Sequence, residues 1–181
     1  MIQHRIGRFA VALTAVLLPL AGVQVVAATT ASAAPNVVNL QYDSTDAPDY
    51  LSEADQAAAN WNGAVSNVHL DSGGGATIVI HEVTGGGSYT QTDGHGSGDI
   101  YIDTAQVAEG NDPTRILAHE MGHNLGLPDH YTGPCTEIMS GHGPGPSCKN
   151  AMPDAQESAQ VDQNFANGFA TSSTLVSRVY R

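Results

Sequence analysis

Positive charge is scarce in this 181-residue sequence. Lysine and arginine together number 6 against 18 aspartates and glutamates, so the formal net charge is −12 at pH 7. Arg5 and Arg8 stand in the first 35 residues, which contain no acidic residue, and without them the net charge is −14. Such a surface repels nucleic acid and anionic membranes, which excludes a polyanion as partner. The acidic residues are dispersed, so no charged disordered tail is expected.

The apolar run near the start has the features of a secretory signal. Arg5 and Arg8 give it a basic start, residues 9–23 are apolar with few interruptions, and Ala31-Ser32-Ala33 offers a small-residue cleavage site. An uncleaved membrane anchor is the alternative, which the proline and the small residues of this segment disfavour. We therefore predict a signal peptide at residues 1–34 and a secreted, extracellular mature protein.

Cysteine occurs only twice, at Cys135 and Cys148. In an oxidising compartment two cysteines most often form a disulfide, and closing this loop would stabilise the fold by about 3 kcal/mol through chain entropy. Two thiolates on zinc are the alternative, but a structural zinc site usually needs a second close pair. We predict the disulfide.

The length suits one domain with its own core, and neither a repeat nor a second domain is visible. Hydrophobic periodicity predicts strands at residues 37–42, 76–83 and 99–103 and helices at 50–65, 113–125 and 154–167. In the first helix, Ser52 and Asp55 are the N-terminal signal and Trp61 is expected in the core. The last helix has as its candidate buried positions Ala155, Ala159, Val161, Phe165 and Ala166.

The segment 85–98, rich in Gly, Ser and Thr, is expected to form a loop. His95 lies within it, and no partner histidines stand at ligand spacing, so a second metal site there is the weaker interpretation. The 20 glycines and the 6% aromatic content agree with many turns around a modest core.

The helix predicted at 113–125 carries the strongest motif of the chain, His-Glu-x-x-His. Asp112 can cap this helix and Gly126 can end it in a left-handed conformation. His119 and His123 are four residues apart and therefore lie on one face, where both imidazoles can reach one metal ion. Catalytic zinc needs three protein ligands and one open position, so a third ligand must follow the turn.

Asp129 and His130 compete for the third ligand position. In the extended motif HExxHxxGxxH the third ligand stands three residues after the glycine, and that register falls on Asp129. A carboxylate is an accepted zinc ligand. His130 is one residue out of register, so we prefer Asp129.

These residues carry a family resemblance. HExxHxxGxxD at 119–129, followed by His-Tyr, Gly-Pro-Cys, Met-Ser and a second cysteine, resembles snapalysin, a family of small neutral metalloproteases of the metzincin clan. The resemblance covers about residues 37–168. It implies an α+β fold with a twisted mixed sheet, an active-site helix and a small irregular C-terminal subdomain. The polar tail at 169–181 is not explained by the resemblance.

The resemblance also implies roles for single residues. His119, His123 and Asp129 would hold Zn²⁺, and Glu120 would act as general base in the hydrolysis of peptide bonds. Tyr131 would donate to the oxyanion, or simply pack. The remaining implied roles are the Met-turn at Met139, the disulfide Cys135–Cys148, and a calcium ion at Asp112 and Thr114, although a helix cap explains Asp112 equally well.

The resemblance leaves several points open. It implies a preference for an aromatic residue just after the cleaved bond, and residues 99–103 are our candidate for the edge strand that pairs with substrate backbone. We expect a monomer that acts on proteins or peptides without stable membrane association. The alternatives are an exported zinc-binding protein without catalysis and a zinc amidase for non-peptide substrates. Family precursors usually carry a propeptide, which this leader leaves little room for, and no spare cysteine could act as a latency switch.

Overall fold

The computed structural model describes residues 37–168 and 176–180. The signal peptide predicted at 1–34 therefore lies outside the described residues. None of the described helices is long and apolar enough to cross a membrane.

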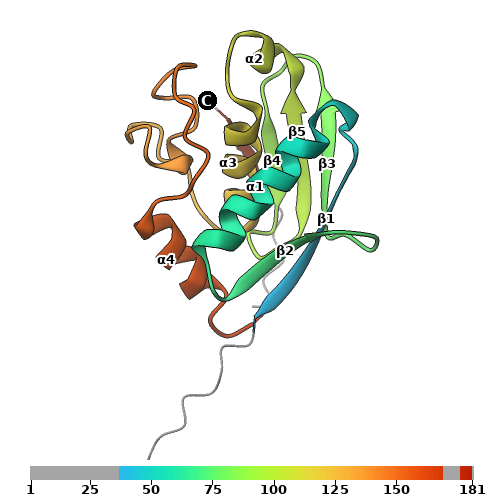
Figure 1. Cartoon of the computed structure of the whole chain (residues 1–181), viewed down its shortest axis with the longest axis vertical. Coiled ribbons are helices and arrows are strands. Elements are labelled where there is room, and N and C mark those ends of the chain that lie inside the picture. The colour runs from blue at the N-terminus through green and yellow to red at the C-terminus, as the bar shows by residue number, and fades with distance from the viewer. Residues whose placement is uncertain (1–36, 169–175, 181) are drawn as a thin grey trace, which may run out of the picture. The chain divides into compact units, whose positions relative to one another are not determined.

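A six-stranded mixed sheet forms the framework (Figure 1). Its strands run in the order β2-β1-β3-β5-β4-β6, with parallel pairing from β2 to β5 and antiparallel pairing of β4 with both of its neighbours. The strands are β1 (Val38–Asp46), β2 (Val68–Ser72), β3 (Ile78–Val83), β4 (Tyr89–Thr92), β5 (Gly98–Asp103) and β6 (Val176–Val179). The predicted α+β fold with a mixed sheet is confirmed.

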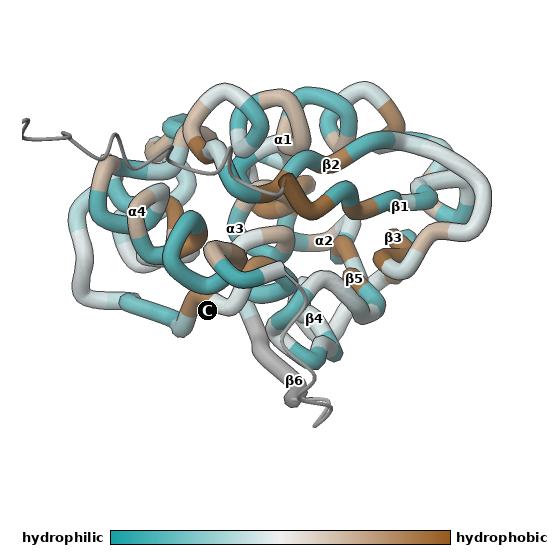
Figure 2. The backbone as a smooth tube through the Cα atoms, turned by 90° about the horizontal axis from the view of Figure 1, so that it is seen from below, coloured by the Kyte–Doolittle hydropathy of each residue, from teal (hydrophilic) through white to brown (hydrophobic). Residues whose placement is uncertain are grey.

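The helices pack against this sheet because their buried stripes and the inward residues of the strands share one core. Both α1 and α3 contact the sheet, α1 at β1 and β2 and α3 at β4 and β5, and they pack on each other. The apolar residues of β1, β3 and β5 show as brown segments in Figure 2. The helices are α1 (Leu51–Ala64), α2 (Thr104–Ala108), α3 (Pro113–Asn124) and α4 (Ala155–Asn164), with short 3₁₀ turns η1 (Pro48–Tyr50) and η2 (Ile138–Ser140).

Strand β4 corrects two predictions. Residues 89–92 form a strand within the segment that was expected to be a loop, and β5 lies between β3 and β4. The prediction that residues 99–103 form an edge strand is therefore wrong. The sequence Tyr-Thr-Gln-Thr carries no aliphatic residue, but threonine and tyrosine favour strands, and Thr90 and Thr92 are buried.

Two helix details also differ from the predictions. The start of α1 has Tyr50 as N-cap without a side-chain bond, while Ser52 donates to the neighbouring Glu53 instead. In α4 the predicted alanines are exposed, and the buried positions are Glu157, Val161 and the following Phe165. Trp61 is fully buried and donates to the carbonyl of Ala118, which confirms it as a core residue.

Arg115 connects α3 to the irregular segment between α3 and α4. Its side chain is 1% exposed, and no ion pair of the described residues includes it. Instead, the guanidinium donates to the Ser140 hydroxyl and to the backbone oxygens of residues 135, 137, 141 and 150. One planar cation thus satisfies five acceptor groups of a segment with little regular structure.

Replacing Arg115 by lysine tests this connection. A lysine ammonium cannot match the fork of five N–H donors, so several buried carbonyl groups would lose their partner. We expect Arg115→Lys to lower the free energy of unfolding by about 3 kcal/mol in urea denaturation. Lys149→Ala, at an exposed position with a single carbonyl partner, is the control and should change it by less than about 0.5 kcal/mol. Equal effects of both variants would contradict the role of Arg115.

Asp103 fixes the connection that leads into β4. Burial alone would raise the pKa of its carboxyl, but hydrogen bonds from the backbone N–H groups of Gly85, Ala105 and Gly87 outweigh burial and hold the pKa below its ordinary value. The ionised carboxylate therefore stabilises both the loop before β4 and the start of α2.

Asp103→Asn should lower the free energy of unfolding by about 2 kcal/mol at pH 7, because an amide nitrogen would face one of the N–H donors. Since the folded pKa is depressed, the carboxylate stabilises fully above the ordinary value of about 3.9, and this contribution is lost as the pH falls through the lower folded value. The difference from wild type should therefore shrink below about pH 4. Unfolding curves from pH 3 to 7 measure it, with exposed Asp49→Asn as control; a difference independent of pH would contradict this account.

Candidate metal centre

The helix α3 presents the central motif between two well-defined ends. Asp112 is the N-cap, and its carboxylate accepts from the N–H of Arg115, while Pro113 stands in the first turn. At the other end Gly126 adopts a left-handed conformation with φ 89°. A Cβ at Gly126 would lie 2.6 Å from the Asn164 amide nitrogen and 2.8 Å from the Gly94 oxygen. Glycine is thus needed both for the reversal of the chain and for close packing.

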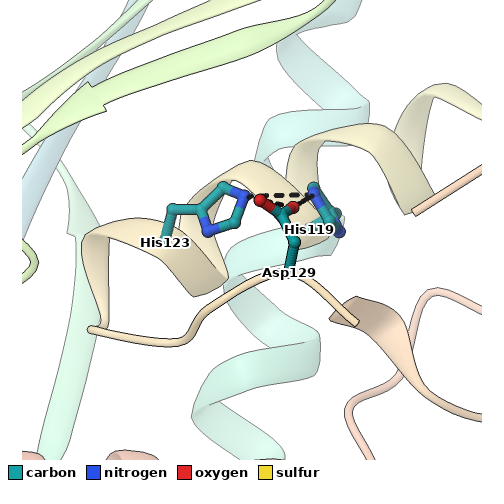
Figure 3. Close-up of side chains that lie close together, drawn as sticks. All are labelled: His119, His123 and Asp129. Atoms are coloured by element: carbon teal, nitrogen blue, oxygen red, sulfur yellow. Dashed lines mark hydrogen bonds and ion pairs between the residues drawn. The ribbon is translucent and has the colours of Figure 1, made fainter. Parts of the chain in front are cut away.

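This reversal returns Asp129 to the face of α3 that carries the histidines (Figure 3). The Nε2 atoms of His119 and His123 are 3.1 Å apart, and one carboxylate oxygen of Asp129 lies 3.3 Å and 3.2 Å from them. Both imidazoles are fully buried, and the carboxylate is partly exposed. Among the described residues these three form the group of His, Cys, Asp or Glu side chains that could hold a metal ion.

The hydrogen bonds of the two rings fix which nitrogen faces the cluster. His119 contacts the Ile138 carbonyl through Nδ1 at 3.0 Å, and His123 contacts the Leu127 carbonyl through Nδ1 at 2.8 Å. A carbonyl oxygen only accepts, so each Nδ1 carries the proton, and in the neutral rings both Nε2 atoms turn a lone pair toward Asp129. Three acceptor atoms therefore converge on one point.

Convergent acceptors at these distances fit a tetrahedral zinc ion. Bonds from zinc to imidazole nitrogen and carboxylate oxygen are about 2.0–2.2 Å long, so ligand atoms on a tetrahedral ion lie about 3.3–3.6 Å apart. The observed separations of 3.1–3.3 Å are close to that range. The carboxylate oxygen has no hydrogen-bond donor among the described residues, which a bound cation would explain.

The pKa values of His119 and Asp129 favour the protonation states that metal ligands need, whereas that of His123 shifts the other way. Burial lowers the pKa of His119 to about 4, which keeps its ring neutral. Burial acts in the same direction on His123, but Asp129 and Glu120 outweigh it and raise the pKa of that ring. Burial would raise the pKa of Asp129, yet the nearby imidazoles of His119 and His123 and a hydrogen bond with Tyr131 outweigh burial and hold it well below its ordinary range.

Glu120 lies next to the cluster as a buried carboxylate with one free oxygen. The Thr90 hydroxyl on β4 donates to its Oε2 at 2.6 Å, whereas Oε1 has no partner among the described residues. Burial raises the pKa of Glu120 to about 7, although His123 and Thr90 act against the rise. A carboxylate with a pKa near neutrality can both take and return a proton at working pH.

A second carboxylate, that of Glu157 on α4, holds the η2 turn next to the cluster. It accepts from the N–H groups of Ile138 and Met139 at 3.0 Å and 2.8 Å, and it completes a capping box with Asp154. The Ile138 carbonyl in turn holds His119. Glu157 therefore fixes the η2 turn that orients a histidine of the cluster.

Met139 packs directly against α3 at Gly122, the fourth residue of the motif. A Cβ at Gly122 would lie 2.5 Å from the Met139 sulfur and 3.2 Å from the Trp61 ring. Met139 is 3% exposed, and its role as the Met-turn stays a prediction.

The remaining predicted site residues lie outside the cluster of His119, His123 and Asp129. His130, the competitor of Asp129, has a side chain that is 59% exposed and bonded to Glu137, outside the cluster. The disulfide Cys135–Cys148 is formed, with a Cα–Cα distance of 5.7 Å, as predicted. Asp112 serves as helix cap and Thr114 is partly buried beside it, so the calcium ion stays a prediction.

The comparison with known families decides the identity of the chain. Residues 37–168 match the Streptomyces extracellular neutral proteinase (M7) family. The chain belongs to this family. As an M7 member it is an extracellular zinc metalloendopeptidase that acts on proteins or peptides, as the sequence analysis predicted.

Two relatives in sequence support this membership. The chain is 52% identical over 132 residues to the extracellular small neutral protease of Streptomyces caespitosus, a match that covers 72% of this chain and 99% of the relative. It is 50% identical over 134 residues to the protein of that name from Streptomyces lividans, which covers 73% of this chain and 59% of that relative. Among solved structures, archaemetzincin from Methanopyrus kandleri is similar with 13% identity and a TM-score of 0.48, over 71% of this chain and 96% of that one.

Three residues of the site escaped the sequence analysis: Thr90, Arg115 and Glu157. For Glu157 a signal existed, because Asp154-x-x-Glu157 is the pattern of a capping box. In such a box the glutamate side chain is held by a hydrogen bond from the backbone N–H of the N-cap residue. The residues next to Thr90 and Arg115 in the sequence give no sign of their hydrogen-bond partners, which lie 20 or more residues away in the chain.

Glu157→Gln tests the path from α4 to the metal. An amide nitrogen would face one of the two N–H donors of η2, so the turn should shift and the orientation of His119 should loosen. We expect the zinc dissociation constant, measured by chelator competition, to rise about tenfold or more. The matched variant Glu109→Gln, at an exposed position, should leave it unchanged. An unaltered zinc affinity in Glu157→Gln would show that η2 holds its position without this carboxylate.

Proposed function

We propose that His119, His123 and Asp129 hold the catalytic zinc ion and that Glu120 is the general base of peptide-bond hydrolysis. The observation that carries this proposal is the convergence of three acceptor atoms beside a buried carboxylate whose second oxygen is unpaired. A structural zinc site has no need for such a carboxylate, which argues against an exported zinc-binding protein without catalysis.

The residues divide the work of hydrolysis between them. Zinc bound at the three ligands would supply Lewis acidity, which lowers the pKa of a water molecule and polarises the scissile carbonyl. Glu120 takes a proton from the attacking water as the water oxygen bonds to the carbonyl carbon. It then passes that proton to the departing amine as the C–N bond breaks. Thr90 holds Oε2 of Glu120, so that Oε1 is the oxygen free to accept the proton.

We assign Tyr131 first to the support of Asp129. Its side chain hydrogen-bonds the Asp129 carboxylate, and this bond helps to lower the pKa of that ligand. Such a bond restricts the carboxylate to one orientation, in the manner of other groups that hold metal ligands. The predicted donation to the oxyanion is compatible with this position and stays a prediction.

The substrate is an extended segment of a protein chain. Extended peptides bind by adding a strand to a sheet, and the strand beside the centre is β4, which carries Thr90 and whose side away from β5 would take the substrate. A pocket beside His123, lined by residues 92–95 and 126–127, offers room for a substrate side chain. The preference for an aromatic residue after the cleaved bond follows from the family resemblance and belongs to this proposal.

Glu120→Ala tests the mechanism. The variant should keep its fold and its zinc, because Glu120 is not one of the three ligands, but lose casein hydrolysis by about a thousandfold. His119→Ala should instead lose zinc, while His69→Ala, at an exposed position, should retain both zinc and activity. Zinc content by elemental analysis, circular dichroism and casein hydrolysis with and without a chelator give the answer. Full activity in Glu120→Ala would overturn the general-base assignment.

A further inference from the structure

The strand β6 occupies the outer edge of β4, where the proposed function expects substrate. Its residues Val176–Val179 pair antiparallel with Thr92–Tyr89, in the register Thr90↔Arg178. The pairing continues one residue further, since the Tyr180 N–H donates to the Ser88 carbonyl at 2.7 Å. The Gln106 side chain donates to the Tyr180 carbonyl at 3.2 Å and so holds the end of this segment.

Tyr180 itself reaches the metal centre. Its side chain is 2% exposed, and its ring meets the ring of His119 edge to face at a centroid distance of 5.0 Å. The ring of His142 lies 5.9 Å away, and the Arg115 guanidinium is close enough to act electrostatically on the Tyr180 hydroxyl. The segment therefore combines a strand on β4 with an aromatic side chain against a proposed zinc ligand.

This segment lies outside the part of the chain that defines the family. The match to the M7 family ends at residue 168, and the Streptomyces caespitosus relative is matched over 99% of its length by 132 residues of this chain. The protease framework of the relatives is thus accounted for without β6, which favours a role for β6 in control rather than in chemistry.

We propose that residues 176–180 are an autoinhibitory segment that occupies the substrate edge of the same chain. The proposal rests on the proposed function, because it takes β4 as the strand that binds substrate. Each outward N–H and C=O of β4 can pair with one neighbour only, so a substrate strand and β6 compete for the same hydrogen bonds. His119 and Glu120 expose no surface while the segment is in place. Substrate therefore gains access to β4 when the segment leaves.

The register of β6 allows a sharp test in the full chain. Hydrogen-bonded and non-hydrogen-bonded pairs alternate along an antiparallel ladder. Because Tyr180 and Ser88 form a hydrogen-bonded pair, Arg178 opposite Thr90 is the next one, and Ser177 opposite Gln91 is not. A proline at 178 removes a bond to β4, whereas a proline at 177 removes an N–H that points away from β4.

Arg178→Pro should raise kcat/KM on a short quenched fluorescent peptide about tenfold, since it increases the fraction of molecules with a free edge. Ser177→Pro should stay within about twofold of wild type, and Arg178→Ala should do the same because it keeps the backbone N–H. Zinc content should be equal in all variants. Unchanged or reduced activity in Arg178→Pro would overturn the proposal and make β6 a structural strand.

A binding measurement separates this inference from the proposed function. In the Glu120→Ala background, a labelled extended peptide should bind the Arg178→Pro chain about tenfold more tightly in fluorescence anisotropy, whether or not the wild type hydrolyses it. Tighter binding without any hydrolysis in the active background would reject the general-base mechanism and keep the autoinhibition. If the wild type hydrolyses the peptide and all chains bind it equally, the general-base mechanism stands and the autoinhibition is rejected. Specific activity that depends on protein concentration would overturn the assignment to the same chain and indicate exchange of β6 between two copies.

Discussion

The geometry of the metal centre depends on the guanidinium of Arg115. This residue stands one helical turn before His119, which in turn stands one turn before His123, so the three share a stripe of α3. Arg115 donates hydrogen bonds to backbone oxygens on both sides of η2, and the Ile138 carbonyl of η2 orients His119. The same helix thus carries two proposed zinc ligands and the cation that holds the irregular segment beside them.

Glu157 complements Arg115 on the other side of that segment. The arginine satisfies carbonyl groups, whereas the glutamate satisfies the N–H groups of Ile138 and Met139. The segment has turn bonds of its own, and these two buried side chains pair backbone groups that the turns leave over. The disulfide Cys135–Cys148 closes the loop in which these acceptors lie. Order in this part of the chain therefore comes from side chains rather than from helices or strands.

The sequence predicted the parts of the site that depend on local spacing. The face shared by His119 and His123, the cap at Asp112 and the reversal at Gly126 follow from helix geometry, and the register after Gly126 selected Asp129 over His130. Thr90, Arg115 and β4 were missed because their contacts are long-range and involve polar or backbone atoms, which leave no hydrophobic period. Val161 and Phe165 are buried as predicted, whereas the alanines at and after α4 were misassigned for a related reason. Alanines suit a buried stripe, yet the buried position is Glu157, which bonds to η2.

The close approach of three acceptor atoms has a consequence for how the protein survives outside the cell. Lone pairs held about 3 Å apart repel one another, so a metal-free chain must protonate one ring or let the cluster spread. An ion that binds the folded cluster and not the unfolded chain adds stability in proportion to the logarithm of its free concentration. Folding and metal uptake are then a single linked equilibrium. In zinc-poor surroundings such a protein loses stability together with its metal, and unfolded copies become substrates for the copies that remain loaded.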